Sequence, residues 1–99
     1  MEKRKFIWDT YHEEFSTTNL KLTHKTSDGN RMAYHLFPIL LNKNIKISRD
    51  EFLIKLNKAG IGCGVHYESI LQHPYYKKNF ISKKNKTPIA HEFGRSEIS

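Results

Sequence analysis

Residues 48–67 read SRDEFLIKLNKAGIGCGVHY, and this stretch decides the fold that we expect. Ser48 and Glu51 form the pattern of a capping box, in which a serine hydroxyl and a glutamate three residues later satisfy each other's free backbone N–H groups. A helix is therefore expected to begin here. Its buried face consists of Phe52, Leu53, Leu56 and Ala59.

The same stretch predicts the end of that helix and a strand after it. Gly60 occupies the position at which a left-handed residue closes a helix. Ile61–Tyr67 is short, apolar and glycine-spaced, so it predicts a strand. Before the helix, Ala33–Leu41 is apolar and aromatic and predicts another strand, although Pro38 cannot donate to a ladder and favours an edge or a bulge. A strand, a helix and a second strand that are joined by short loops predict a βαβ-like unit. The expected fold is therefore a two-layer domain of the α/β (α+β) class.

Two further helices are expected to pack on this small sheet. The N-terminal segment Glu2–Phe15 carries Ile7, Trp8, Tyr11 and Phe15 at three- and four-residue spacing, which is typical of an amphipathic helix. Thr87-Pro88 has the chemistry of a helix start, and the last helix should carry Ile89, Ala90, Phe93 and Ile98. No glycine or proline closes it, so it is expected to run to the chain end.

The connecting segments have weaker signals. Ser16–Asn30 is polar and predicts a loop with a short extended piece at Leu20 and Leu22. Leu71–Phe80 predicts a short helix, and Ile81–Lys86 predicts a polar, lysine-rich loop.

Length and composition place limits on the class of protein. The chain has 99 residues, which is enough for one domain (1–99) with one modest core. The net charge is +7, which favours an anionic partner without choosing among nucleic acid, a phosphorylated ligand and a membrane surface. Cys63 is the single cysteine and has no partner for an internal disulfide, so a cytoplasmic setting is expected. No apolar run reaches transmembrane length.

Several motifs admit a functional and a structural interpretation. The glycines at 60, 62 and 64 lack the spacing and the preceding strand of a dinucleotide-binding loop. The six histidines (12, 24, 35, 66, 73 and 91) show no metal-ligand spacing, so no metal site is expected. Cys63 has no base beside it in sequence and is interpreted as an inert thiol. Lys77–Lys86 with Tyr75, Tyr76 and Phe80 has the composition of a stacking platform for single-stranded nucleic acid, but a solvated loop beside packed aromatic side chains is favoured.

His66 is the histidine whose position suggests function. It ends the second expected strand, and ligands of α/β sheets usually bind at the carboxyl ends of strands.

The order of motifs along the chain resembles that of a known family. Tyr34-His35-Leu36-Phe37, the capping segment that starts at Ser48, and Gly60-Ile61-Gly62-Cys63-Gly64-Val65-His66-Tyr67 are followed by Pro74 and Tyr76. This pattern resembles the C-terminal small domain of the DegT/DnrJ/EryC1/StrS aminotransferases. The helix with Arg4 and Trp8-Asp9-Thr10-Tyr11-His12 resembles the helix that opens that domain.

The resemblance implies a fold-type I, pyridoxal-phosphate-dependent enzyme. Such enzymes usually form homodimers and transfer an amino group from glutamate to a keto-sugar attached to a nucleotide, in cell-surface polysaccharide biosynthesis. The resemblance also implies that the Schiff-base lysine and the cofactor-binding groups belong to a large domain that precedes this segment. No catalytic and no cofactor-binding residue is therefore expected here, and the chain alone is expected not to bind the cofactor or to be active. A separate large-domain chain or a homodimer is the implied protein partner.

Two residues carry over from the family as substrate contacts. The resemblance implies that His66 makes a hydrogen bond to the sugar nucleotide or contacts its phosphate, and that the Tyr67 ring packs against the ligand as a wall of the site. Ser69 and Leu71 depart from the proline and histidine that many members have there. Family members also continue into a Leu-Pro segment and a final helix, so the resemblance implies a small domain that is truncated at its C-terminal end. The alternative function is a basic α/β module that binds nucleic acid or another anion.

Overall fold

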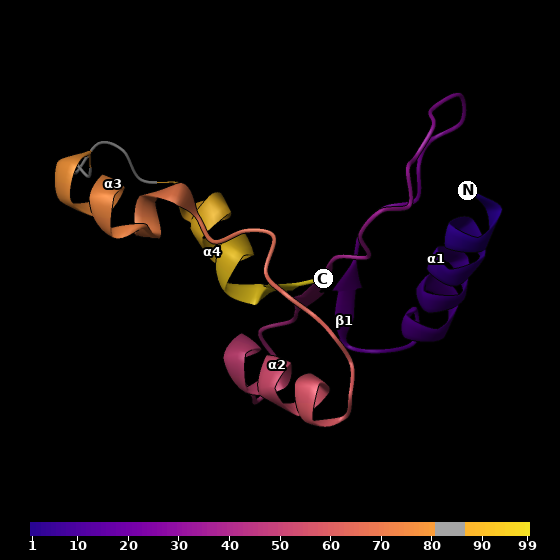
Figure 1. Cartoon of the computed structure of the whole chain (residues 1–99), viewed down its shortest axis with the longest axis horizontal. Coiled ribbons are helices and arrows are strands. Elements are labelled where there is room, and N and C mark those ends of the chain that lie inside the picture. The colour runs from indigo at the N-terminus through magenta and orange to yellow at the C-terminus, as the bar shows by residue number, and fades with distance from the viewer. Residues whose placement is uncertain (81–86) are drawn as a thin grey trace.

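The computed structural model describes residues 1–80 and 87–99, so the loop expected at 81–86 lies outside the described residues. Figure 1 shows a small sheet between helices that reach it from different sides. In chain order, the elements are α1 (Glu2–Phe15), β1 (Leu20–Leu22), β2 (Ile39–Leu41), α2 (Arg49–Lys58), a 3₁₀ turn (Ile70–Gln72), α3 (Pro74–Asn79), α4 (Pro88–Ser96) and β3 (Glu97–Ile98).

The sheet is antiparallel and has the order β1-β2-β3. Leu22 lies opposite Ile39, which in turn lies opposite Ile98, so these three side chains share one face. Leu40 lies opposite Glu97 on the other face, on which α4 lies and where Phe93 lines an open pocket together with Leu40. Helices on both faces of a small sheet confirm the α/β class and the packing by an N-terminal and a C-terminal helix.

Helix α1 docks through an aromatic cluster whose buried member is Trp8, and the rings of Tyr11 and Phe15 also lie near that of Phe37, at 5.4 and 6.1 Å. Trp8 is 4% exposed, and its ring lies 5.4 Å from that of Phe37 and 5.9 Å from that of Tyr34, both edge-on. These contacts explain why the strand expected at Ala33–Leu41 is shorter than predicted. Residues 34–37 supply aromatic rings to α1, and Pro38 comes immediately before the ladder rather than within it.

The start and end of α2 confirm the local prediction. The Ser48 side chain accepts from the Glu51 N–H, and the Glu51 carboxylate accepts from the Ser48 N–H at 2.8 Å. The hydrogen bond from the Ser48 backbone N–H lowers the pKa of the Glu51 carboxyl. Gly60 has a φ of +79°, as a left-handed closing residue requires. Phe52, Leu53 and Leu56 are half-buried, whereas Ala59 is exposed, contrary to the prediction.

The strand expected at Ile61–Tyr67 is wrong, and so is the βαβ-like unit built on it. Within that segment, Gly64 alone exchanges a pair of backbone hydrogen bonds with a distant residue, at 2.7 and 3.1 Å to Ser99. The strand beside β2 is instead β3, which runs antiparallel to it. A two-residue β3 offers too short an edge for a further ladder, and the glycines at 62 and 64 add no side chains that would pack across it.

The last helix is also shorter than expected. α4 ends at Ser96, and the chain then enters β3, where Ile98 is 2% exposed. Ile98 therefore belongs to the sheet and not to the helix. The prediction failed because the burial of Ile98 against Ile39 is a long-range contact that local spacing does not reveal.

The face of the sheet between α1 and α2 carries an uncovered apolar trough. Its lining comes from α1, β1, β2, α2, the 61–63 segment and the end of β3. Ile7, Tyr11 and Ile61 along it are about half exposed (50%, 46% and 52%). Among the described residues, only Trp8, Ile39 and Ile98 are buried hydrophobic side chains, so the core is thin.

Candidate functional site

His66 lies in a short segment that is held by the end of the chain. Its backbone N–H donates to Glu97 Oε2 at 2.7 Å, and its ring Nδ1 lies 2.5 Å from Ser99 Oγ. The ring is half-buried, whereas the neighbouring Tyr67 is 76% exposed. The two rings are 5.0 Å apart at 73°, so Tyr67 stands edge-on beside a fixed imidazole.

His66 and Tyr67 form one wall of an open pocket whose other wall is the start of α4. The pocket is lined by His66, Tyr67, Ser69, Thr87, Pro88, Ile89, Ala90 and Phe93. Most of this surface is apolar or aromatic, and the polar side-chain groups are an imidazole and the three hydroxyls of Tyr67, Ser69 and Thr87. Apolar walls with a few placed polar groups are typical of small-molecule sites.

The first turn of α4 forms the other wall of this pocket and begins at Pro88, which has no backbone N–H to donate. Thr87 makes no side-chain capping bond, and Pro88 occupies the first turn. The positive end of a helix dipole favours an anionic group such as a phosphate. The sequence places this turn and His66 more than twenty residues apart, and the fold brings them together.

Close approach of α4 to the His66 segment depends on Gly94. A Cβ at this position would lie 2.8 Å from the Ser69 backbone nitrogen and 3.2 Å from the Tyr67 carbonyl oxygen. The same glycine is tied to α2, because Arg49 Nη1 donates to its carbonyl oxygen at 2.9 Å. Glycine here sets the distance between the two walls of the pocket.

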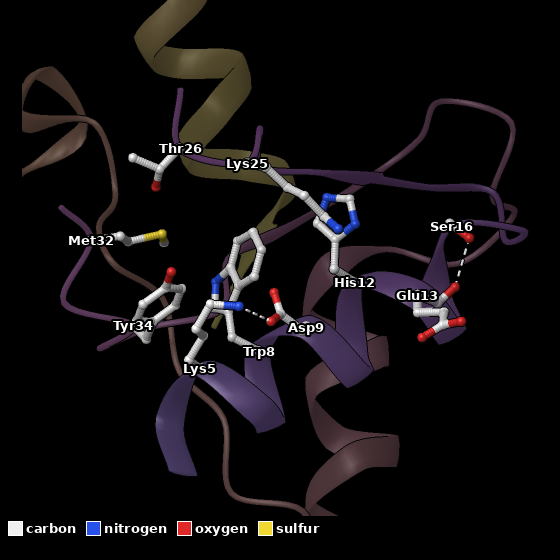
Figure 2. A pocket seen from close by; sticks show the side chains of 10 residues that line it. All are labelled: Lys5, Trp8, Asp9, His12, Glu13, Ser16, Lys25, Thr26, Met32 and Tyr34. Atoms are coloured by element: carbon white, nitrogen blue, oxygen red, sulfur yellow. Dashed lines mark hydrogen bonds and ion pairs between the residues drawn. The ribbon is translucent and has the colours of Figure 1, made fainter. Parts of the chain in front are cut away.

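A second pocket lies between α1 and the 25–34 segment, and Figure 2 shows its side chains. Lys5 and Asp9 form an ion pair of 2.5 Å along α1, and the Trp8 ring stacks on that of His12 at 5.1 Å. A lysine, a carboxylate and aromatic rings are the group types that a pyridoxal phosphate site uses, so this pocket is the place where such a cofactor would have to fit.

The residues of this pocket do not fit the cofactor. The hydrogen bond from Lys5 to Asp9 raises the pKa of Lys5, whereas a Schiff-base lysine must lose its proton. The same ion pair lowers the pKa of Asp9 and occupies the carboxylate that would face a pyridine nitrogen. Outside this pocket, Lys43 is paired with Glu92 at 2.7 Å, and that hydrogen bond likewise raises the pKa of Lys43.

The structure places the remaining candidates from the sequence as follows, within the residues that it describes. Within residues 1–80 and 87–99, no three His, Cys, Asp or Glu side chains gather in a metal-binding group. Cys63 is half-buried, and Asn57 donates to its sulfur at 3.8 Å. The rings of Tyr75, Tyr76 and Phe80 pack on one another at 5.4 to 6.1 Å.

Sequence reasoning missed three residues that shape the His66 pocket: Gly94, Glu97 and Ser99. Glu97-Ile98-Ser99 alternates polar, apolar and polar, and this alternation is the signal of a short strand. It was obscured because Ile98 also lies eight residues after Ala90, a spacing at which helical side chains share a face.

The fold and the His66 pocket define a small α/β domain with an open pocket that could bind a small molecule. Among its described residues, the pocket between α1 and the 25–34 segment does not suit pyridoxal phosphate. The model of the DegT/DnrJ/EryC1/StrS aminotransferase family matches residues 1–99, and the chain belongs to that family. The family is generally pyridoxal-phosphate-dependent and acts on nucleotide-linked sugars.

Three relatives illustrate the match. The uncharacterised protein MJ1066 of Methanocaldococcus jannaschii is 35% identical over 99 residues, which are 99% of this chain and 26% of that protein. The UDP-4-amino-4,6-dideoxy-N-acetyl-beta-L-altrosamine transaminase of Campylobacter jejuni is 33% identical over 100% of this chain and 26% of its own length. The spore coat polysaccharide biosynthesis protein SpsC of Bacillus subtilis is 28% identical over 99% of this chain and 26% of its own length.

The chain therefore spans about a quarter of the length of these relatives. In the ranges that the structure describes, no helix has the length and apolar character needed to cross a membrane.

Proposed function

We propose that residues 1–99 are the small domain of a pyridoxal-phosphate-dependent aminotransferase that passes an amino group from glutamate to a keto-sugar linked to a nucleotide. In this proposal, His66 and Tyr67 contact the sugar nucleotide. The observation that carries it is the placement of a fixed imidazole and an exposed tyrosine in one apolar pocket of a family member. One relative is a UDP-sugar transaminase and another is a spore coat polysaccharide biosynthesis protein. These names support a role of the whole enzyme in cell-surface polysaccharide synthesis.

The chemistry of the pocket suits such a ligand. Sugar and base rings have apolar faces and polar edges, which match the apolar and aromatic side chains of Tyr67, Ile89 and Phe93 and the polar groups of His66 and Ser69. The positive end of the α4 helix dipole favours a phosphate group of such a ligand, although Pro88 itself donates no hydrogen bond. His66 supplies a hydrogen bond at the polar edge, and Tyr67 excludes water from the ring face.

In this proposal, the chain contributes binding and not cofactor chemistry. Pyridoxal phosphate supplies the electron sink of transamination when an enzyme binds it. The groups that would hold it belong to a second polypeptide or a further domain of about three times this length, as the 26% coverage of the relatives suggests. The apolar trough between α1 and α2 is the surface that we assign to that partner. The free thiol of Cys63 fits a reducing compartment such as the cytoplasm.

Pyridoxal phosphate added to the purified chain is expected to give no stable internal-aldimine absorbance, because Lys5 and Asp9, the lysine and carboxylate of the pocket between α1 and the 25–34 segment, are paired with each other. The measurement is an absorbance titration followed by borohydride reduction and peptide mapping. Asp9→Asn is the matched control, since it removes the partner of Lys5 and should increase slow, unspecific labelling there. A stoichiometric, reducible adduct on one lysine of the unmodified chain would refute the proposal that this chain only binds substrate.

A further inference from the structure

We propose that Ser99 and Glu97 are positioning residues for His66, and that they present ring nitrogen Nε2 to the nucleotide-linked sugar. The inference rests on the proposed function for the identity of the ligand. The arrangement of the three residues themselves stands on the geometry alone.

Ser99 controls the ring. Its Oγ lies 2.5 Å from His66 Nδ1, so one of the two ring nitrogens is already engaged. The hydroxyl is itself fixed, because the Ser99 backbone exchanges two hydrogen bonds with Gly64, two residues before the histidine. A serine hydroxyl can donate to Nδ1 or accept from it, so in either tautomer Ser99 holds the His66 ring in one orientation. Nε2 is then the nitrogen left for a ligand.

Glu97 controls the backbone. Its side chain is fully buried, and Oε2 accepts the His66 N–H at 2.7 Å. Glu97 lies in β3 opposite Leu40, so its hydrogen bond fixes the His66 backbone relative to the sheet. Ring and backbone are therefore both held by the segment 97–99, from residues that do not line the pocket.

The other oxygen of Glu97 argues against a purely structural role. Among the described residues, Oε1 is buried without a hydrogen-bond partner. A buried carboxylate oxygen left unpaired opposes folding, and an apolar side chain in its place would avoid that cost. The gain from glutamate at this position is its hold on the His66 N–H.

The experiment uses the full chain with labelled histidine nitrogens, at a pH about two units above the ordinary histidine pKa of about 6.5, so that neutral rings are compared. In the unmodified chain, the His66 ring is expected to hold one orientation, seen as ring nitrogen shifts that differ from those of a freely rotating histidine and as NOEs between the ring and Ser99. His73, which is exposed, is expected to show averaged shifts and serves as the internal reference. Averaged shifts for His66 as well would overturn the proposal without any variant.

Ser99→Ala should move the His66 ring shifts to the averaged values of His73, and Ser99→Thr, which keeps the hydroxyl, should restore them. The affinity for UDP should fall about three- to tenfold in Ser99→Ala and recover in Ser99→Thr, a change of the size expected for one hydrogen bond.

Glu97→Ala should shift the His66 amide proton upfield, and Glu97→Gln should preserve most of its position, because an amide oxygen still accepts. Ring shifts that are identical in the unmodified chain and Ser99→Ala would sink the positioning role. Absence of UDP binding alongside the expected ring shifts would instead reject the proposed function and leave the positioning role intact.

Discussion

Trp8→Ala is expected to lower the free energy of unfolding by about 3–5 kcal/mol, the usual cost of deleting a buried tryptophan. Trp8 is 4% exposed and its ring contacts those of His12, Tyr34 and Phe37. A domain of this size is marginal, with a total stability of roughly 5–15 kcal/mol, so the variant should lose α1 from the sheet or unfold. Circular dichroism during urea unfolding measures the effect, since Trp8 is the only tryptophan and its fluorescence is lost.

Phe6→Ala is the matched control for Trp8→Ala. Phe6 is on the same helix but is 73% exposed, so its removal should change stability by no more than about 0.5 kcal/mol. Equal urea midpoints for the two variants would contradict the docking of α1 through Trp8.

Gly94→Ala is expected to destabilise the chain by up to about 2 kcal/mol, because the clash of the new methyl group outweighs the better helix propensity of alanine. The methyl group would lie 2.8 Å from the Ser69 backbone nitrogen, and overpacking of this kind costs about 1–3 kcal/mol. Replacing glycine by alanine inside a free helix would instead gain up to about 1 kcal/mol. Either α4 or the 67–69 segment must move, so the amide resonances of Tyr67 and Ser69 should shift.

Gly62→Ala provides the control for Gly94→Ala, since no atom lies within 4 Å of the added carbon. That substitution should leave stability unchanged or raise it slightly by reducing the freedom of the unfolded chain. A rise in the urea midpoint of Gly94→Ala would contradict the close packing of α4 on the His66 segment.

The parts of the fold that the sequence predicted well are those controlled by local chemistry. Ser48, Glu51 and Gly60 start and close α2 through contacts within a few residues, and the spacing of apolar residues marked α1 over its observed bounds. The membership of the family was also indicated by one short string, Gly60–Tyr67, although that string is not a strand.

The errors arose where a distant segment decides the outcome. Ile98 fits both the spacing of a helix and the alternation of a strand, and only its burial against Ile39 resolves the choice. His66 was predicted as a site residue from its place at a strand end, yet the structure holds it through Glu97 and Ser99, over thirty residues away. Gly94 gave no signal in the sequence, because a glycine within a helix marks close packing only when the neighbouring segment is known.

The most direct test of the His66 pocket as a nucleotide-sugar surface is a ¹H–¹⁵N titration of the full chain with UDP and with UDP-N-acetylglucosamine. We predict saturable shifts of the His66, Tyr67 and Ser69 amides, which His66→Ala abolishes while the Trp8 indole resonance stays in place. Saturable shifts confined to Tyr75, Tyr76 and Phe80 that disappear steeply as salt rises would indicate an unspecific anion surface and would contradict the proposal, as would the absence of any shift at His66 and Tyr67.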